Sequence, residues 1–150
     1  FQMGDTKLNE DVVVPPDAYL PLIEATLEII AATGLATPTF GHAADGNFHV
    51  HIMYDHGDPA KEAAAADALT RLMEKVVALG GTITGEHGIG LAKSPFLRLQ
   101  HTAVEIKAMR AIKDALDPNG ILNPDKVFTP LKLWEHPRDR EAVFPWDNRH

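Results

Sequence analysis

The spacing of hydrophobic residues in the first third of the chain predicts a strand followed by a helix. Residues 12–14 are three consecutive valines that end at Pro15-Pro16, a pattern typical of a strand that leaves a sheet at a turn. From about Pro21, hydrophobic residues recur at helical spacing as far as Gly34, a residue type that commonly ends helices. The apolar stripe of this amphipathic helix consists of Ile23, Leu27 and Ile30.

The next segment predicts a tight antiparallel hairpin. Its strands lie at about residues 36–42 and 47–53, and they are joined by Asp45-Gly46, a pair that favours a two-residue type I′ turn. With that turn, His42 lies directly opposite His49. Because side chains alternate along a strand, one face of the second strand is apolar and the other carries histidines. The apolar face holds Phe48, Val50 and Ile52, and the other holds His49 and His51.

A second helix and a short strand are predicted in the middle of the chain. Asp58 is the expected N-cap, Pro59 occupies the first helical position, and Gly80-Gly81 ends the helix. The buried stripe predicted for it is Leu69, Leu72, Met73 and Val76. Residues 82–84 then form a short strand that runs into Gly85-Glu86-His87-Gly88.

The last helix predicted begins with Thr102 and Glu105, which have the spacing of a capping box, and ends at residues 117–120. Its stripe is Met109, Ile112 and Leu116. The order strand, helix, strand, strand, helix, strand predicts an α+β fold, the ferredoxin-like split βαβ. We expect an antiparallel sheet with helices on one face, followed by a C-terminal helix and an extended tail. Residues 1–130 form the predicted domain, and residues 131–150 form the proline-punctuated tail.

Composition narrows the possible partners. A chain of 150 residues with 45% hydrophobic residues fits one globular domain. Its net charge of -7 argues against nucleic-acid binding, which needs clustered Lys and Arg. No apolar run approaches the roughly 20 residues that span a bilayer, so no membrane segment is expected. Cysteine is absent, so a cytoplasmic location is only the default expectation, and membrane contact through a partner stays open.

The predicted hairpin brings two imidazoles together. Directly opposed residues have Cβ atoms about 4.5 to 5.5 Å apart, close enough for His42 and His49 to bind one ion. A Zn²⁺ or Fe²⁺ site then needs a third ligand, either Glu86 or Asp45, and Asp45 is more economically explained as a turn residue. His87 is a natural proton acceptor. Adjacent residues on an extended chain point apart, so Glu86 and His87 reach one site only if the flanking glycines bend the chain.

Three motifs together resemble the C-terminal domain of FAD-linked oxidases. They are Gly-His-Ala-Ala-Asp-Gly-Asn-Phe-His at 41–49, Gly-Glu-His-Gly-Ile-Gly at 85–90 and Leu-Asn-Pro-Asp-Lys at 122–126. The resemblance extends from about Lys7 to about Phe128, and it includes the Leu-Asn-Glu-Asp run before the valines. This chain has Ala44 where the family's first motif often has glycine.

The resemblance implies a set of site residues. His42, His49 and Glu86 would hold a divalent metal, Zn, Mn or Fe. His87 would be the catalytic base and His51 would face the substrate. Asn47 and Asn123 would lie near the flavin. Of these assignments, the pairing of His42 with His49 also follows from the predicted hairpin, whereas Glu86 rests more on the resemblance.

The resemblance also implies a reaction. A D-2-hydroxy acid of the lactate, glycolate or 2-hydroxyglutarate type would be oxidised to the 2-oxo acid, with hydride passing to FAD. The electron acceptor that follows FAD is unknown. The sequence has no Gly-x-Gly-x-x-Gly cradle, so FAD is expected to bind mainly to an upstream domain. We therefore expect this chain alone neither to hold FAD tightly nor to turn over substrate.

Two other functions are compatible with two histidines and one glutamate. A hydrolase would use the same ligands to activate a bound water, although it leaves the 122–126 motif unexplained. A non-catalytic metal-binding module would use the ion only to stabilise the hairpin and would fill the fourth coordination position. The coordination number of the bound ion therefore separates the module from both enzymes.

Overall fold

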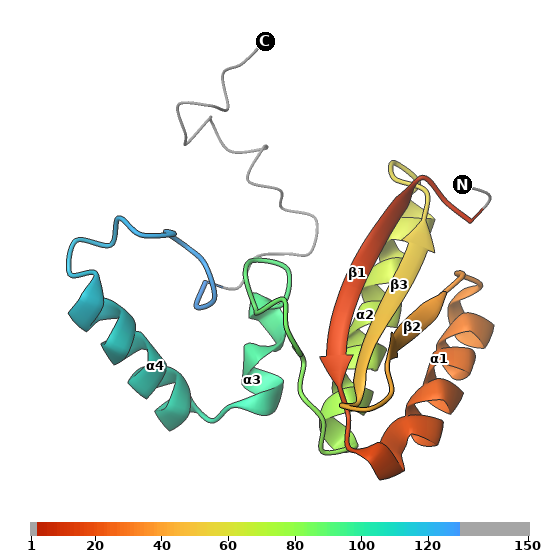
Figure 1. Ribbon diagram of the computed structural model, residues 1–150. Coiled ribbons are helices and arrows are strands. Elements are labelled where there is room, and N and C mark those ends of the chain that lie inside the picture. The colour runs from red at the N-terminus through yellow and green to blue at the C-terminus, as the bar shows by residue number, and fades with distance from the viewer. Residues whose placement is uncertain (1–2, 130–150) are drawn as a thin grey trace.

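The computed structural model describes residues 3–129, so the predicted tail at 131–150 lies outside the described residues and the domain boundary at 130 stays a prediction. Three strands and two long helices form the body, and α4 follows it (Figure 1). In chain order the elements are β1 (Thr6–Val13), the 3-10 turn η1 (Pro16–Ala18), α1 (Tyr19–Thr33), β2 (Thr39–His42), β3 (Asn47–Tyr54), α2 (Pro59–Ala78), η2 (Ser94–Phe96), α3 (Leu97–Gln100) and α4 (Ala103–Leu116).

The sheet is antiparallel, with strand order β1-β3-β2, and the predicted α+β fold is confirmed. The strand predicted at 82–84 is reduced to one bridge, in which Thr82 and Val13 exchange backbone hydrogen bonds of 2.8 and 3.1 Å at the outer edge of β1. The chain leaves β1 after this bridge because the backbone N–H groups of residues 85–87 turn toward a side chain of β1. A ladder of backbone pairs cannot continue past that point.

One face of the sheet packs against α1 and α2, and this layer is the hydrophobic core (Figure 1). Val12, Val50 and Ile52 point from the sheet into it. The stripe predicted for α2 is confirmed, since Leu69, Leu72, Met73 and Val76 are all buried. The opposite face carries the odd-numbered residues of β3, so packing and chemistry are separated by the alternation of the strand.

Two of the predicted helical stripes are wrong. In α1 the buried residues are Leu22, Ala25, Thr26 and Ile29, while Ile23 and Leu27 are 45% and 59% exposed. The helix is apolar on more than one side, and packing against α2 decides which side is buried. In α4, all of which is described, no residue is buried, and Ile112 and Leu116 are 63% and 77% exposed. The helix itself is present with the predicted capping box of Thr102 and Glu105.

Other element boundaries also differ from the predictions. β1 begins at Thr6, well before the predicted valine run, because its polar N-terminal half pairs with β3 as far as Thr6 opposite Tyr54. β2 begins at Thr39 and not at residue 36, although the carbonyls of Ala36 and Pro38 still accept hydrogen bonds from β3. The predicted end of α1 is confirmed, because Gly34 adopts a left-handed backbone with φ of 69°.

The predicted cap of α2 is confirmed and gives a measurable contribution to stability. The Asp58 carboxylate accepts hydrogen bonds from Ala60 N–H at 3.0 Å and Lys61 N–H at 3.3 Å. We expect Asp58→Ala to lower the free energy of unfolding by about 1 kcal/mol in a urea titration. The matched control is Asp67→Ala in the same helix, which removes only the exposed ion pair with Arg71 and should change it by less than about 0.5 kcal/mol. Equal losses in both variants would contradict a capping role.

Candidate metal centre

The hairpin has a different register from the predicted one. His42 pairs with Asn47, and His49 pairs with Phe40. The connection is therefore a four-residue loop, 43–46, in place of the two-residue turn of Asp45-Gly46. The predicted direct opposition of His42 and His49 is wrong. His42 shares a face of the sheet with its partner Asn47, and His49 lies two positions after Asn47 on the same strand face. His42 and His49 are therefore diagonal neighbours on one face.

Contacts with the rest of the fold account for the longer loop. The Gly46 carbonyl accepts a hydrogen bond of 3.0 Å from Val14 N–H, and the Tyr19 hydroxyl donates to the Ala43 carbonyl. A Cβ on Gly46 would lie 2.1 Å from the Val14 carbonyl oxygen, and the residue has φ of 74°, so only glycine fits there. The loop is thus docked on the segment after β1, and this docking overrides the local preference for a tight turn.

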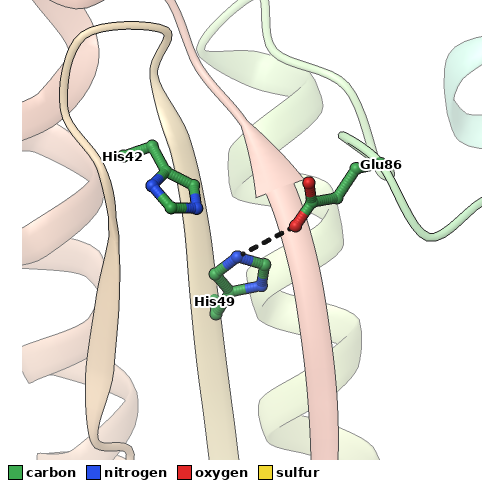
Figure 2. Close-up of side chains that lie close together, drawn as sticks. All are labelled: His42, His49 and Glu86. Atoms are coloured by element: carbon green, nitrogen blue, oxygen red, sulfur yellow. Dashed lines mark ion pairs between the residues drawn. The ribbon is translucent and has the colours of Figure 1, made fainter.

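The diagonal arrangement still brings the two imidazoles together. The ring centroids of His42 and His49 are 5.8 Å apart and the rings are nearly perpendicular. His49 is buried in the middle of β3, whereas His42 is exposed at the end of β2. Figure 2 shows the two rings side by side on the hairpin, with Glu86 reaching toward them from a separate segment.

Glu86 completes a cluster that has the composition of a metal site. Its Oε1 lies 3.3 Å from His49 Nε2, the contact drawn as a dashed line in Figure 2. One ligand atom from each of His42, His49 and Glu86 lies within 4.8 Å of the other two. Two imidazole nitrogens and one carboxylate oxygen are a donor set that suits Zn²⁺, Mn²⁺ or Fe²⁺ and leaves further positions open. The residues present therefore fit a divalent metal.

The loop that carries Glu86 is curled around one buried carboxylate. Asp11 Oδ2 accepts hydrogen bonds from three consecutive backbone N–H groups, those of Gly85 at 2.8 Å and of Glu86 and His87 at 2.9 Å. It also accepts from the Thr84 hydroxyl at 3.1 Å. Gly88 follows with φ of 79°. The chain is therefore bent as the sequence argument required, and adjacent residues Glu86 and His87 both reach His49.

Asp11 is buried, which alone would raise its pKa. The hydrogen bonds from His87 N–H, the Asn47 side chain, Glu86 N–H and Gly85 N–H outweigh that effect and hold the pKa well below its ordinary value of 3.8. The carboxylate is consequently ionised at neutral pH, when it offers only acceptors to these donors.

His87 and His51 flank the cluster. The rings of His49 and His87 have centroids 5.3 Å apart, and His87 Nε2 lies 3.7 Å from Glu86 Oε1. His51 lies two residues along β3 on the same face, edge-on to the exposed ring of Phe40. Burial lowers the pKa of His51, and the nearby Lys7 and His49 lower it further. His51 is consequently mostly neutral at pH 7, when it can either donate or accept a hydrogen bond.

Comparison with known proteins decides the family. The model of the family "FAD linked oxidases, C-terminal domain" matches residues 2–127. This chain belongs to that family. It is 40% identical over 127 residues to the glycolate oxidase subunit GlcD of Bacillus subtilis, covering 85% of this chain and 27% of the relative. It is 40% identical over 118 residues to the mitochondrial D-lactate dehydrogenase [cytochrome] of Kluyveromyces lactis. That match covers 79% of this chain and 20% of the relative.

A third relative is the glycolate oxidase subunit GlcD of Escherichia coli strain K12, 35% identical over 121 residues and covering 81% of this chain and 24% of the relative. This FAD-linked oxidase domain thus spans between a fifth and a third of the length of these relatives. Within residues 3–129, no helix is both long and apolar enough to cross a bilayer.

The two asparagines assigned to the cofactor lie in different surroundings. In this FAD-linked oxidase domain Asn47 is buried, and its Nδ2 donates a 2.6 Å hydrogen bond to Asp11 Oδ1. Its Oδ1 is also buried and has no hydrogen-bond partner among the described residues. Asn123 lies on an exposed turn after α4, with φ of 46°, and no hydrogen bond within residues 3–129 joins its side chain to the cluster. Asp45 is likewise exposed and outside the cluster.

Sequence reasoning assigned no role to two residues that support the site. Asp11 holds the Glu86 loop, and Lys93 Nζ donates to the Asp11 carbonyl while lying 3.9 Å from Glu10 Oε2. Burial raises the pKa of Glu10 and lowers that of Lys93, and the attraction between the two opposes both shifts. The only signal in the sequence was an acidic pair, Glu10-Asp11, placed directly before a buried run of valines.

Proposed function

We propose that this domain forms the metal-binding and substrate-binding side of an FAD-dependent dehydrogenase that oxidises a D-2-hydroxy acid to the 2-oxo acid. The observation that carries the proposal is the cluster of His42, His49 and Glu86 with His87 beside it. A divalent metal, an adjacent base and a carboxylate substrate are complementary, because a 2-hydroxy acid offers its hydroxyl and carboxylate oxygens as a pair of ligands. The names of the relatives, a glycolate oxidase subunit and D-lactate dehydrogenases, support this substrate class.

In the proposed site His42, His49 and Glu86 hold Zn²⁺, Mn²⁺ or Fe²⁺. A metal bound there would act as a Lewis acid that lowers the pKa of the substrate hydroxyl and orients the substrate. His49 is held rigidly by its burial in β3, whereas His42 and Glu86 are exposed enough to adjust around an ion. The side of the cluster that faces away from the sheet is then free for the substrate.

His87 is the proposed catalytic base. It lies beside His49 with its side chain 44% exposed, so it is accessible to a substrate that binds over the cluster. His87 accepts the hydroxyl proton as the carbon–oxygen double bond of the 2-oxo acid forms. His51, on the same face and adjacent to Phe40, is placed to contact the rest of the substrate.

FAD is the proposed acceptor of the hydride from the α-carbon, and its binding is assigned to a domain that this sequence does not contain. This FAD-linked oxidase domain has no dinucleotide cradle, and its relatives are three to five times as long as the matched segment. We propose that Asn47 and Asn123 lie near the flavin in the assembled enzyme.

The complete gene product tests the function. We expect it to purify with FAD and to bleach its flavin absorbance in the absence of oxygen with one of D-lactate, glycolate or D-2-hydroxyglutarate. If the substrate is one of the two chiral acids, its L-isomer should not bleach the flavin. The 150-residue chain alone should bleach nothing. Flavin-free hydrolysis of esters or amides by the complete protein, with no bleaching, would favour a metal-dependent hydrolase and contradict the proposal. Metal binding with neither activity would favour the non-catalytic module.

A further inference from the structure

Asp11 lies at the centre of the site without belonging to the cluster. It is fully buried in β1 and pairs directly with His49 of β3, so both side chains emerge on the same face of the sheet. Its two oxygens accept five hydrogen bonds. Four reach Oδ2, from Thr84 and from the N–H groups of Gly85, Glu86 and His87, and the fifth reaches Oδ1 from Asn47 Nδ2.

These bonds connect two parts of the site that come from different segments, the sheet and the loop at 85–87, in addition to the contacts of His49 with Glu86 and His87. His49 is fixed by the sheet, whereas Glu86 and His87 lie on a loop whose backbone has left the sheet after Thr82. Among the described residues, the hydrogen bonds of the 85–87 backbone N–H groups all end on Asp11 Oδ2. Within residues 3–129, Asp11 is therefore the group that anchors the backbone N–H groups of residues 85–87, and Glu86 meets His49 from that anchored loop.

From this geometry we propose that Asp11 is the positioning residue of the metal centre: it fixes the Glu86–His87 loop opposite His49 and thereby sets the metal affinity. The inference rests on the metal site of the proposed function. Asp11 touches neither ion nor substrate in this role and acts through Glu86. Groups that orient metal ligands in this way typically contribute about 10- to 100-fold to metal affinity.

The chemistry of the site requires a carboxylate at this position. All five groups that hydrogen-bond to the Asp11 side chain are donors, and the buried Lys93 ammonium lies 3.9 Å from Oδ2. An ionised carboxylate has only acceptors, with about four lone-pair directions to share. An asparagine of the same shape would replace one acceptor by an NH₂ group. That group would point a donor either at the Asn47 amide or at the 85–87 backbone.

The loop is packed closely against Asp11 and Asn47 at Gly85. A Cβ on Gly85 would lie 2.0 Å from Asn47 Nδ2 and 2.6 Å from Asp11 Oδ1, so the backbone is packed directly on the Asp11–Asn47 pair. On the other side Lys93, which is buried, donates to the Asp11 carbonyl and holds the strand at this point. Asp11 is thus packed against the loop on one side and held at its backbone carbonyl by Lys93 on the other.

The test is Asp11→Asn in the 150-residue chain, measured by Co²⁺ or Zn²⁺ titration against a chromophoric chelator and by amide hydrogen exchange. We expect a 10- to 100-fold loss of affinity and faster exchange of the Gly85, Glu86 and His87 amides in metal-free protein, with an unchanged far-UV spectrum. Asp117→Asn is the matched control, because Asp117 is also a buried carboxylate that accepts from loop N–H groups, those of Ile121 and Leu122. It should leave metal affinity unchanged.

A double-mutant cycle with Glu86→Gln separates positioning from general destabilisation. If Asp11 acts through Glu86, Asp11→Asn should cost little further affinity once Glu86 no longer provides its carboxylate. Equal losses in both backgrounds, or unchanged affinity in Asp11→Asn, would overturn the inference while leaving the metal site intact. Absence of metal binding by the unmodified chain would overturn the metal site and this inference together.

A second variant keeps the inference testable if Asp11→Asn does not fold. Thr84→Val removes one donor to Asp11 and the acceptor of Gly88 N–H, which lies 2.8 Å from the Thr84 hydroxyl, and leaves the carboxylate in place. Because two hydrogen bonds are lost, we expect it to weaken metal binding by at least the roughly 2- to 10-fold that corresponds to one of them. Full affinity with normal exchange protection of the loop would count against the role of Asp11.

Discussion

Replacement of His87 by glutamine is expected to lower kcat of the complete gene product by about 100- to 10,000-fold, the usual contribution of a general base. Glutamine keeps the length and hydrogen-bonding capacity of the side chain but cannot take a proton at neutral pH. His87 lies beside the cluster but is not one of the three residues that form it. The variant should therefore retain both metal and flavin. The measurement is steady-state dye reduction with the best of the three hydroxy acids.

Two readouts make this result specific. Metal content by elemental analysis and FAD content by absorbance should equal those of the unmodified enzyme, so that the loss appears in kcat and little in KM. His56→Gln is the matched control, because His56 also forms a pair with a glutamate, with Nδ1 3.0 Å from Glu62 Oε1, but at the beginning of α2. It should keep full activity. A His87→Gln enzyme within a few-fold of normal kcat would eliminate His87 as the base.

Removal of a metal ligand is expected to cost more affinity than removal of the residue that positions it. Glu86→Gln and His49→Gln in the 150-residue chain should each weaken Zn²⁺ binding by more than the roughly 10- to 100-fold associated with an outer-shell partner. Glu86→Gln removes a charged carboxylate oxygen, and His49→Gln removes an imidazole nitrogen. Borderline divalent metals prefer both of these ligands to an amide oxygen. After dialysis against a weak chelator, elemental analysis should find little bound metal in either variant.

The control for this loss is again chosen within the chain. Glu62, like Glu86, contacts a histidine, but its partner is the single imidazole of His56. Glu62→Gln therefore makes the same chemical change outside the cluster. Its metal content should match that of the unmodified protein, as should its unfolding midpoint in the absence of metal. Equal metal content in Glu86→Gln, His49→Gln and Glu62→Gln would refute the three-residue site.

The sheet explains how a domain of this size can combine a core with the candidate metal site. Along β3, Val50 and Ile52 point toward α1 and α2, whereas Asn47, His49 and His51 point to the opposite face. β1 adds Asp11 to that second face, and the loop after Thr82 adds Glu86 and His87. The side chains of the candidate site that lie on β1 and β3 and the side chains that pack the core therefore belong to the same strands and do not compete for space.

Much of this protein was predictable from local sequence. The first residues of α2 and α4 could be predicted from Asp58 and from the Thr102–Glu105 capping box, because an N-cap is a contact between residues two or three positions apart. The proposed ligands His42 and His49 came from the pattern of the hairpin, and Glu86 came mainly from the resemblance to the family. The α+β class followed from the order of periodic segments, since strand and helix periods differ within a few residues.

Only the tertiary structure decided the register of the hairpin, the buried side of α1 and the path of the Glu86 loop. In each case the deciding contact joins distant residues: Val14 with Gly46, α1 with α2, and Asp11 with residues 74 to 76 positions later. A two-residue turn at Asp45-Gly46 is favourable by itself, but a loop docked on Val14 and Tyr19 gains hydrogen bonds that the isolated hairpin lacks. Local patterns specify which groups are available, and long-range packing specifies which of them meet.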